Sequence, residues 1–114
     1  MADKENILTK TYDLMLYIIP QLSKFPRDQR FLLADRIESM LLDFLEDMIA
    51  SYYGSEKLTL IEKGNLRLEK IRYMVRLSKD LHFIDLRRYE LITERIDEIG
   101  RMLGGWRKSL SGRK

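Results

Sequence analysis

Apolar residues recur along this chain at alternating steps of three and four positions, a spacing that places them on one face of an α-helix. Four stretches show it, from about Asn6 to Lys24, from Pro26 to Gly54, from between Ser55 and Thr59 to about His82, and after Asp85. Short connections separate them, so consecutive helices should run antiparallel. The pattern predicts an all-α fold, an antiparallel up-down four-helix bundle.

The periodic residues of each stretch are the expected core. In the last stretch they continue for almost three heptads, as in a coiled coil. The predicted core positions are Leu8, Tyr12, Met15, Ile19 and Leu22 in the first stretch, Ala34, Ile37, Leu41, Phe44 and Met48 in the second, Leu68, Ile71 and Val75 in the third, and Tyr89, Ile92, Ile96, Ile99, Leu103 and Trp106 in the fourth.

Local residues predict where the second and third helices begin and end. Pro26 suits a first helical position, where its missing N–H costs nothing. Gly54 is expected to end the second helix as a left-handed cap. Residues 59–62 (Thr-Leu-Ile-Glu) match a capping box at the start of the third helix.

The last helix has its own boundary signals. Asp85 is a plausible N-cap, and Gly104-Gly105 should end the helix near Trp106. This divides the chain into a bundle over residues 1–106 and a basic, flexible tail over residues 107–114.

The second and third stretches carry more apolar residues than one bundle face needs. Such a surplus indicates either a wider core or an exposed patch that joins copies of the chain, and the second interpretation is favoured. The additional positions are Leu42, Leu45, Ile49 and Tyr52, and Met74, Leu77, Leu81 and Ile84.

Composition narrows the functional classes. The chain has 114 residues, enough for one domain, with 34% charged residues, no cysteine and one histidine. Disulfide scaffolds, thiol nucleophiles and three-histidine metal sites are therefore excluded. No apolar stretch is long enough to span a membrane and no secretion signal begins the chain, so a cytoplasmic protein is expected.

The sequence offers little support for catalysis. His82 has Lys79 three positions before it, so the Glu-x-x-His motif of di-metal bundles is missing. A carboxylate hydrolase remains a weak alternative, because acidic residues cluster at Asp43, Glu46 and Asp47 and at Glu90, Glu94, Asp97 and Glu98. These positions lie off the apolar seams and are better explained as a solvated surface. We expect no enzyme activity, cofactor, metal or small-molecule substrate.

Charge is unevenly distributed. Residues 1–54 carry six basic and nine acidic residues, whereas residues 55–114 carry fifteen basic and nine acidic residues. The second half should therefore present a basic surface that binds phosphates or an acidic protein. The alternative is a solvated helix surface that binds no partner. The candidate binding residues are Arg67, Lys70, Arg72, Arg76, Lys79, Arg87, Arg88, Arg101, Arg107 and Lys108.

Four segments, residues 12–17, 25–31, 65–73 and 97–106, together carry a family resemblance. The last reads Asp-Glu-Ile-Gly-Arg-Met-Leu-Gly-Gly-Trp, and its Gly-Arg-x-Leu-Gly-x-Trp ending is not demanded by helix packing. On these segments the chain resembles the accessory variability determinant (Avd) proteins of bacterial and phage diversity-generating retroelements.

This resemblance implies a non-catalytic, homopentameric barrel of four-helix bundles. It also implies binding to a reverse transcriptase and to RNA or DNA, in support of mutagenic cDNA synthesis and retrohoming. The basic residues of the family's third helix correspond to Arg72 and Arg76, and we extend the expectation to Lys79, Arg101 and the tail. The alternative is a general RNA-binding bundle related to proteins encoded in ribosomal RNA intervening sequences.

Overall fold

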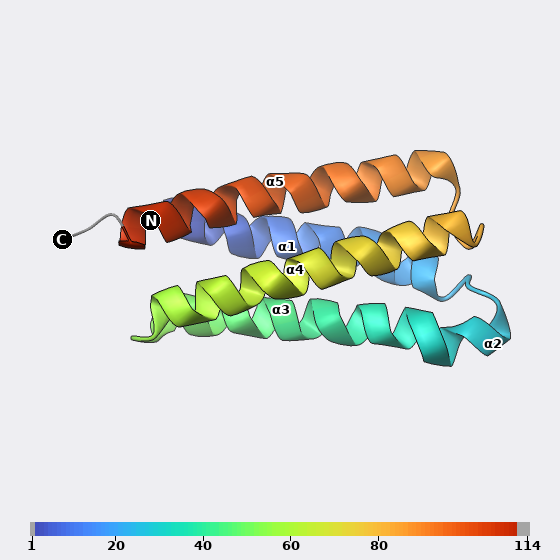
Figure 1. The fold of residues 1–114 in the computed structure, drawn as a ribbon, viewed down its shortest axis with the longest axis horizontal. Helices are drawn as coiled ribbons and strands as arrows, with labels where there is room; N and C mark the ends of the chain where they lie inside the picture. Colours follow the sequence, from blue (N-terminus) through green and yellow to red (C-terminus); the bar gives the residue numbers. More distant parts are fainter. Residues whose placement is uncertain (1, 112–114) are drawn as a thin grey trace.

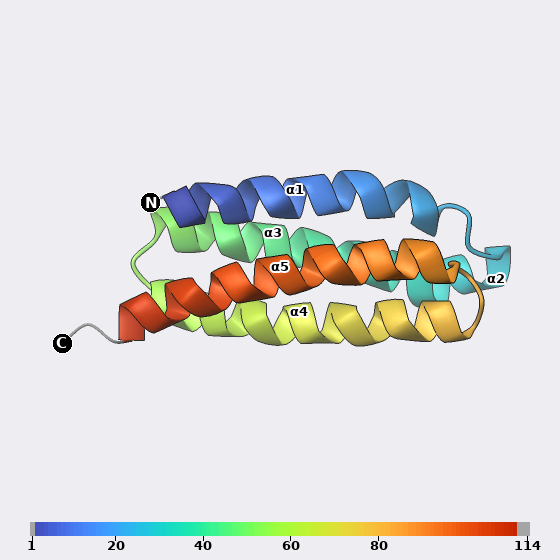
Figure 2. The same ribbon diagram turned by 90° about the horizontal axis from the view of Figure 1, so that it is seen from above.

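Four long helices form the antiparallel bundle that the apolar pattern predicts (Figures 1 and 2). The computed structural model describes the backbone of residues 2–111 and the side chains of residues 7–111. Its long helices are α1 (Ala2–Leu22), α3 (Asp35–Tyr53), α4 (Lys57–Asp80) and α5 (Leu86–Ser111). They pack in a closed order, with α1 against α3 and α5, and α4 against α3 and α5.

The core forms where periodicity places it in three of the four helices. The predicted positions of α4 are buried, as are those of α5 from Ile92 to Trp106, and the predicted positions of the second stretch, including Ala34, are buried as well. In α1, Met15 and Leu22 are buried as predicted and Leu8 and Ile19 are half-buried, but Tyr12 is 58% exposed, and the buried stripe also includes Ile7, Leu14 and Ile18. The cause is Thr11, a polar residue that is completely buried and therefore does not show in the pattern of apolar positions.

The second predicted helix is interrupted near its start. A single turn, α2 (Arg27–Gln29), leads into a π-helix, η1 (Arg30–Ala34), before α3 begins. Pro26 is the residue before the first helical one, not the first itself. The wider π turn leaves Phe31 and Leu32 80% and 69% exposed.

The turn between α3 and α4 differs from both cap predictions. Gly54 is extended, with φ −96° and ψ −178°, so the left-handed cap is wrong. Glycine is needed there for space, because a Cβ would lie 2.7 Å from the carbonyl oxygen of Ala50. The capping box is also wrong, since α4 already begins at Lys57. The Lys57 ammonium instead donates to the carbonyls of Ser51 (2.9 Å) and Tyr52 (3.1 Å) at the end of α3.

The turn between α4 and α5 is closed by a Schellman motif. His82 has φ 67°, its amide donates to the carbonyl of Lys79 (2.9 Å), and the Phe83 amide donates to that of Ser78 (2.8 Å). The rings of Phe83 and Phe25 pack with centroids 5.4 Å apart, joining this turn to the α1–α2 connection. Both turns therefore form one end of the bundle, opposite the chain termini (Figure 2).

The final helix is longer than predicted. Helix α5 continues through Gly104 and Gly105 to Ser111, so the expected end near Trp106 is wrong. Two interior glycines cost roughly 1 kcal/mol each relative to alanine, and this is offset by the burial of Trp106 and an ion pair from Arg107. Residues 107–111 thus belong to the bundle, and the rest of the predicted tail, 112–114, lies outside the described residues.

Candidate nucleic-acid interface

The ten candidate binding residues predicted from the sequence are called the basic stripe here. Its central members, Arg72, Arg76 and Lys79, lie at the groove between α4 and α5. Arg72 projects from α4 toward α5, where it forms an ion pair with Asp97, and its Nε donates to Glu69 Oε2 at 3.3 Å. Its side chain is 29% exposed. Arg72 therefore fixes the register of the two helices at the same time as it faces solvent.

Arg76 lies one turn further along the same side of α4. Its side chain is 62% exposed, and its Nε lies 4.0 Å from Asp80 Oδ2, the loosest ion pair among the described residues. Lys79 holds Asp80 more closely, at 2.8 Å, and lies over the Tyr89 ring at 5.0 Å from its centroid. The hydrogen bond from Lys79 is the main cause that lowers the pKa of Asp80 below its usual value. Asp80 thus pairs mainly with Lys79, and the Arg76 guanidinium is left largely available to bind another anion.

Arg67 and Lys70 lie away from this groove. Arg67 turns toward α3, where its guanidinium pairs with Asp47 at 3.1 Å and Asp43 at 3.4 Å. Its side chain is only 21% exposed, so it joins α3 to α4. Lys70 is exposed and has no ion pair among the described side chains.

The two arginines at the start of α5 differ in their surroundings. Asp85 is the N-cap predicted from the sequence, because its Oδ1 accepts from the Arg88 amide at 2.8 Å. The Arg88 guanidinium also pairs with this carboxylate. The backbone hydrogen bond is the main cause that lowers the pKa of Asp85, and the Arg88 charge adds to it. Arg87 has no ion pair within residues 7–111 and remains available.

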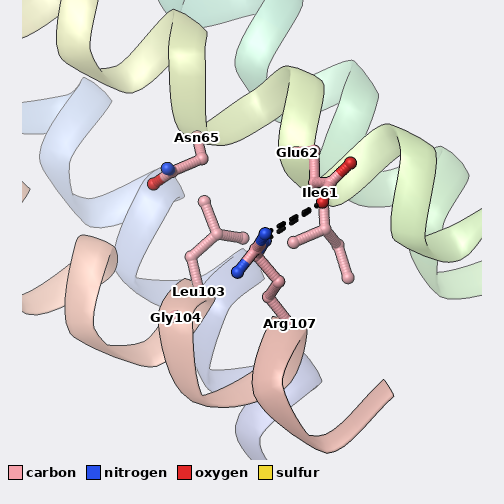
Figure 3. Close-up of a pocket in the computed structure, with 6 residues that line it drawn as sticks. All are labelled: Ile61, Glu62, Asn65, Leu103, Gly104 and Arg107. Atoms are coloured by element: carbon pink, nitrogen blue, oxygen red, sulfur yellow. Dashed lines mark hydrogen bonds and ion pairs between the residues drawn. The ribbon is translucent and has the colours of Figure 1, made fainter. Parts of the chain in front are cut away.

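A hollow of about 340 Å³ opens in the same groove near the end of α5 (Figure 3). Arg107 reaches across it from α5 to Glu62 on α4, with Nη2 3.1 Å from Oε2. Asn65 lines it, and Gly104 adds no side chain to it, since a Cβ there would meet nothing within 4 Å. The exposed Arg101 and Lys108 are on α5 and form no ion pair with any described residue.

The stripe is more neutralised than its sequence suggests. Six of the ten predicted cations have a carboxylate partner within 4.0 Å: Arg67, Arg72, Arg76, Lys79, Arg88 and Arg107. Exposed ion pairs of this kind contribute only about 0–1 kcal/mol, so a phosphate can displace the carboxylate at little cost. The arrangement can therefore bind a polyanion, and mainly one that offers several phosphates together.

Other groove residues were not predicted because they are uncharged. Asn65 and Gly104 line the hollow at the end of α5, while Thr93 lines a second one beside Tyr73 and Tyr89. Tyr73 and Tyr89 directly follow two of the candidate arginines, Arg72 and Arg88, in the sequence. Asn65 could have been found, because it lies seven residues, or two helical turns, before Arg72.

The acidic clusters are largely occupied by ion pairs. Asp43 and Asp47 bind Arg67, Asp97 binds Arg72, and Glu98 Oε2 lies 3.3 Å from Lys10 Nζ. Across the described residues, no three His, Cys, Asp or Glu side chains are placed to hold a metal ion. None of the described helices is both long and apolar enough to cross a membrane.

Four of the eight surplus apolar positions are exposed, and Leu45, Tyr52 and Met74 are half-buried. Leu42 and Ile49 on α3 are 45% and 42% exposed, and Leu77 and Leu81 at the end of α4 are 45% and 46% exposed. Ile84 instead joins the core. Further large apolar side chains exposed on the long helices are Tyr12, Leu16, Tyr53, Leu58, Leu66, Tyr73 and Leu86.

Comparison with known proteins finds one family. A family model described as bAvd-like matches residues 6–110, which is nearly the whole chain and all of the groove's charged residues. No curated protein matches the chain.

Proposed function

Because the chain belongs to the bAvd-like family, we propose that it is a non-catalytic accessory protein of a diversity-generating retroelement. In this proposal it binds template RNA or cDNA together with the retroelement's reverse transcriptase. Holding both raises their local concentration and supports mutagenic cDNA synthesis and retrohoming. The chemistry of copying belongs to the polymerase.

The observation that supports nucleic-acid binding is the set of exposed cations at and near the α4–α5 groove. Arg76 is exposed at this groove, and Arg101 and Lys108 are exposed on α5, with loose or no carboxylate partners among the described residues. They belong to the half of the chain with fifteen basic and nine acidic residues. Arginine forks bind phosphate oxygens in pairs, which favours the nucleic-acid backbone as the ligand.

Self-association then increases the strength of nucleic-acid binding. Exposed apolar side chains lie on α1 and α3, in the acidic half, and on α4, in the basic half. Unlike charges favour contact between the acidic face of one copy and the basic face of the next. Such a head-to-tail contact closes into a ring when its rotation permits, and the family resemblance implies five copies. A ring multiplies the phosphate contacts that one subunit can make.

The nucleic-acid part is tested by measuring RNA affinity at several salt concentrations. Arg76→Ala with Arg101→Ala should weaken binding and reduce the salt slope by about 0.7 for each phosphate of a single strand that the variant no longer neutralises. The matched control is Arg27→Ala with Arg36→Ala, which removes two exposed arginines outside α4 and α5. Equal affinity of the wild type and the groove variant at all salt concentrations would contradict the assignment.

The assembly is tested by measuring molecular mass in solution. Leu42→Glu with Ile49→Glu should shift the wild-type assembly toward monomers, because two carboxylates would enter an apolar contact. Ser39→Glu, at an exposed position on the same helix, should leave the mass unchanged. A wild-type monomer at micromolar concentration would exclude the ring.

Co-purification separates the proposal from its alternative. The accessory role requires that the protein retain the reverse transcriptase encoded beside its gene. RNA binding without such retention would favour a general RNA-binding bundle related to proteins encoded in ribosomal RNA intervening sequences.

A further inference from the structure

A second hollow in the α4–α5 groove combines aromatic rings with arginines. Its volume is about 180 Å³, and it lies between the turns of α4 that carry Arg72, Tyr73 and Arg76 and the first turns of α5. The walls are formed by Glu69, Arg72, Tyr73 and Arg76 of α4 and by Tyr89 and Thr93 of α5. Extending the proposed function, on which this rests, we propose that the hollow binds one unpaired base of a single-stranded RNA.

Tyr73 provides the stacking surface. The residue is 64% exposed, although its ring borders a concave site and contributes nothing to the core. Tyr89, on the other side, is partly buried against the core and is covered by the Lys79 ammonium. The hollow thus has one fixed ring in its wall and one free ring at its edge, and the free ring is available to stack on a base.

Arg76 provides the phosphate contact beside the base. Its side chain is 62% exposed and lies 4.0 Å from a carboxylate that Lys79 already holds at 2.8 Å. Arg72, by contrast, is fixed by Glu69 and Asp97 and forms a rigid wall. One exposed, loosely paired cation next to a hollow is the arrangement needed to bind a nucleotide by its base and by its phosphate.

Glu69 and Arg72 balance each other's charge in the wall of the hollow. Both line the site, and Arg72 Nε donates to Glu69 Oε2 at 3.3 Å, so a phosphate placed inside would gain little from Arg72. A neutral base needs no cation, and its edge can hydrogen-bond to Glu69 or to the Thr93 hydroxyl. The base therefore belongs inside and its phosphate outside, against Arg76.

Stacking on Tyr73 requires an accessible base face. In a duplex both faces of each base are covered by its neighbours, whereas an unpaired base can turn outward onto an aromatic ring. Every base has such a face, so the site tolerates any sequence. The subsite thus confers a preference for single strands over duplexes, which backbone contacts alone do not provide.

The full-length protein should be titrated with a single-stranded RNA and with a duplex of the same length. Tyr73→Leu should weaken single-strand binding about tenfold, the effect of losing one stacked base. It should leave the salt slope and duplex binding unchanged. Tyr73→Phe, which keeps the ring, and Phe31→Leu, which removes an aromatic ring 80% exposed in η1, should both bind as the wild type does.

A cross-linking measurement uses the wild-type protein and therefore does not depend on whether a variant folds. RNA containing iodouridine should cross-link to Tyr73 on irradiation, and cross-links that occur only elsewhere would overturn the subsite. So would a Tyr73→Leu protein that binds single strands normally, or that loses duplex binding equally. If Arg76→Gln weakens binding while Tyr73→Leu does not, only the subsite fails. If the wild type binds no RNA, the proposed function fails with it.

Discussion

Replacing His82 by glycine should stabilise the protein, because this residue has the left-handed conformation that ends α4. Its φ of 67° is the only positive value among the described non-glycine residues. A non-glycine residue in this region costs roughly 1–2 kcal/mol. Glycine removes that cost but gains about 0.4–1 kcal/mol of conformational freedom in the unfolded chain. The two terms leave a net stabilisation of about 0.5–1 kcal/mol.

Thermal unfolding followed by circular dichroism measures this gain. For a domain of this size, about 1 kcal/mol corresponds to an increase in Tm of roughly 4 °C. All variants must be compared at one protein concentration, because the proposed self-association would also change Tm. His82→Ala keeps the strained conformation and should show no increase. A His82→Gly protein that melts at or below the wild-type temperature would refute the strain argument and indicate that the imidazole itself stabilises the turn.

Four further substitutions test other features of the fold. Thr11→Val should raise the free energy of unfolding by about 1 kcal/mol, since the buried Thr11 hydroxyl has no hydrogen-bond partner among the described side chains and backbone; equal or lower stability in urea would contradict this. Gly104→Ala should add about 0.5–1 kcal/mol, because its Cβ would meet nothing within 4 Å. Gly64→Ala should add less, because its Cβ would lie 2.6 Å from Met48 Cε, and equal gains would refute the comparison. The lowered pKa of Asp85 contributes stability that is complete above its ordinary value of 3.8 and is lost as the pH falls through the folded value. Asp85→Asn should therefore flatten the loss of stability in acid, measured by urea unfolding across this range.

The long helices could be predicted because each buries a regular stripe. In α5 the step of three and four holds from Ile92 to Trp106, and that whole stripe is buried. The π-helix could not be predicted, since one extra residue per turn breaks the periodicity on which the prediction rests. The prediction that Gly104 and Gly105 end the last helix was wrong because tertiary packing of the following turn outweighs the low helix propensity of glycine.

The candidate site was only partly predictable. Spacing along α4 placed Arg72 and Arg76 on one face, and the structure agrees. Which carboxylates oppose them depends on the neighbouring helix, so the pairing of Arg72 with Asp97 needed the packed bundle. The hollow beside Tyr73 likewise exists only once the start of α5 lies against α4.

The partial neutralisation of the groove bears on how the proposed scaffold discriminates among anions. A single free phosphate must displace a carboxylate and gains only one exposed contact, so it competes poorly with the protein's own acids. A nucleic-acid strand makes several such exchanges at once and releases counterions at each. In the proposed ring, repetition of the groove would extend this advantage, because the second and later contacts are intramolecular. In this proposal an anion must first displace the carboxylates that pair with residues such as Arg72 and Arg107. A long strand gains enough binding free energy to do so, and a small anion does not.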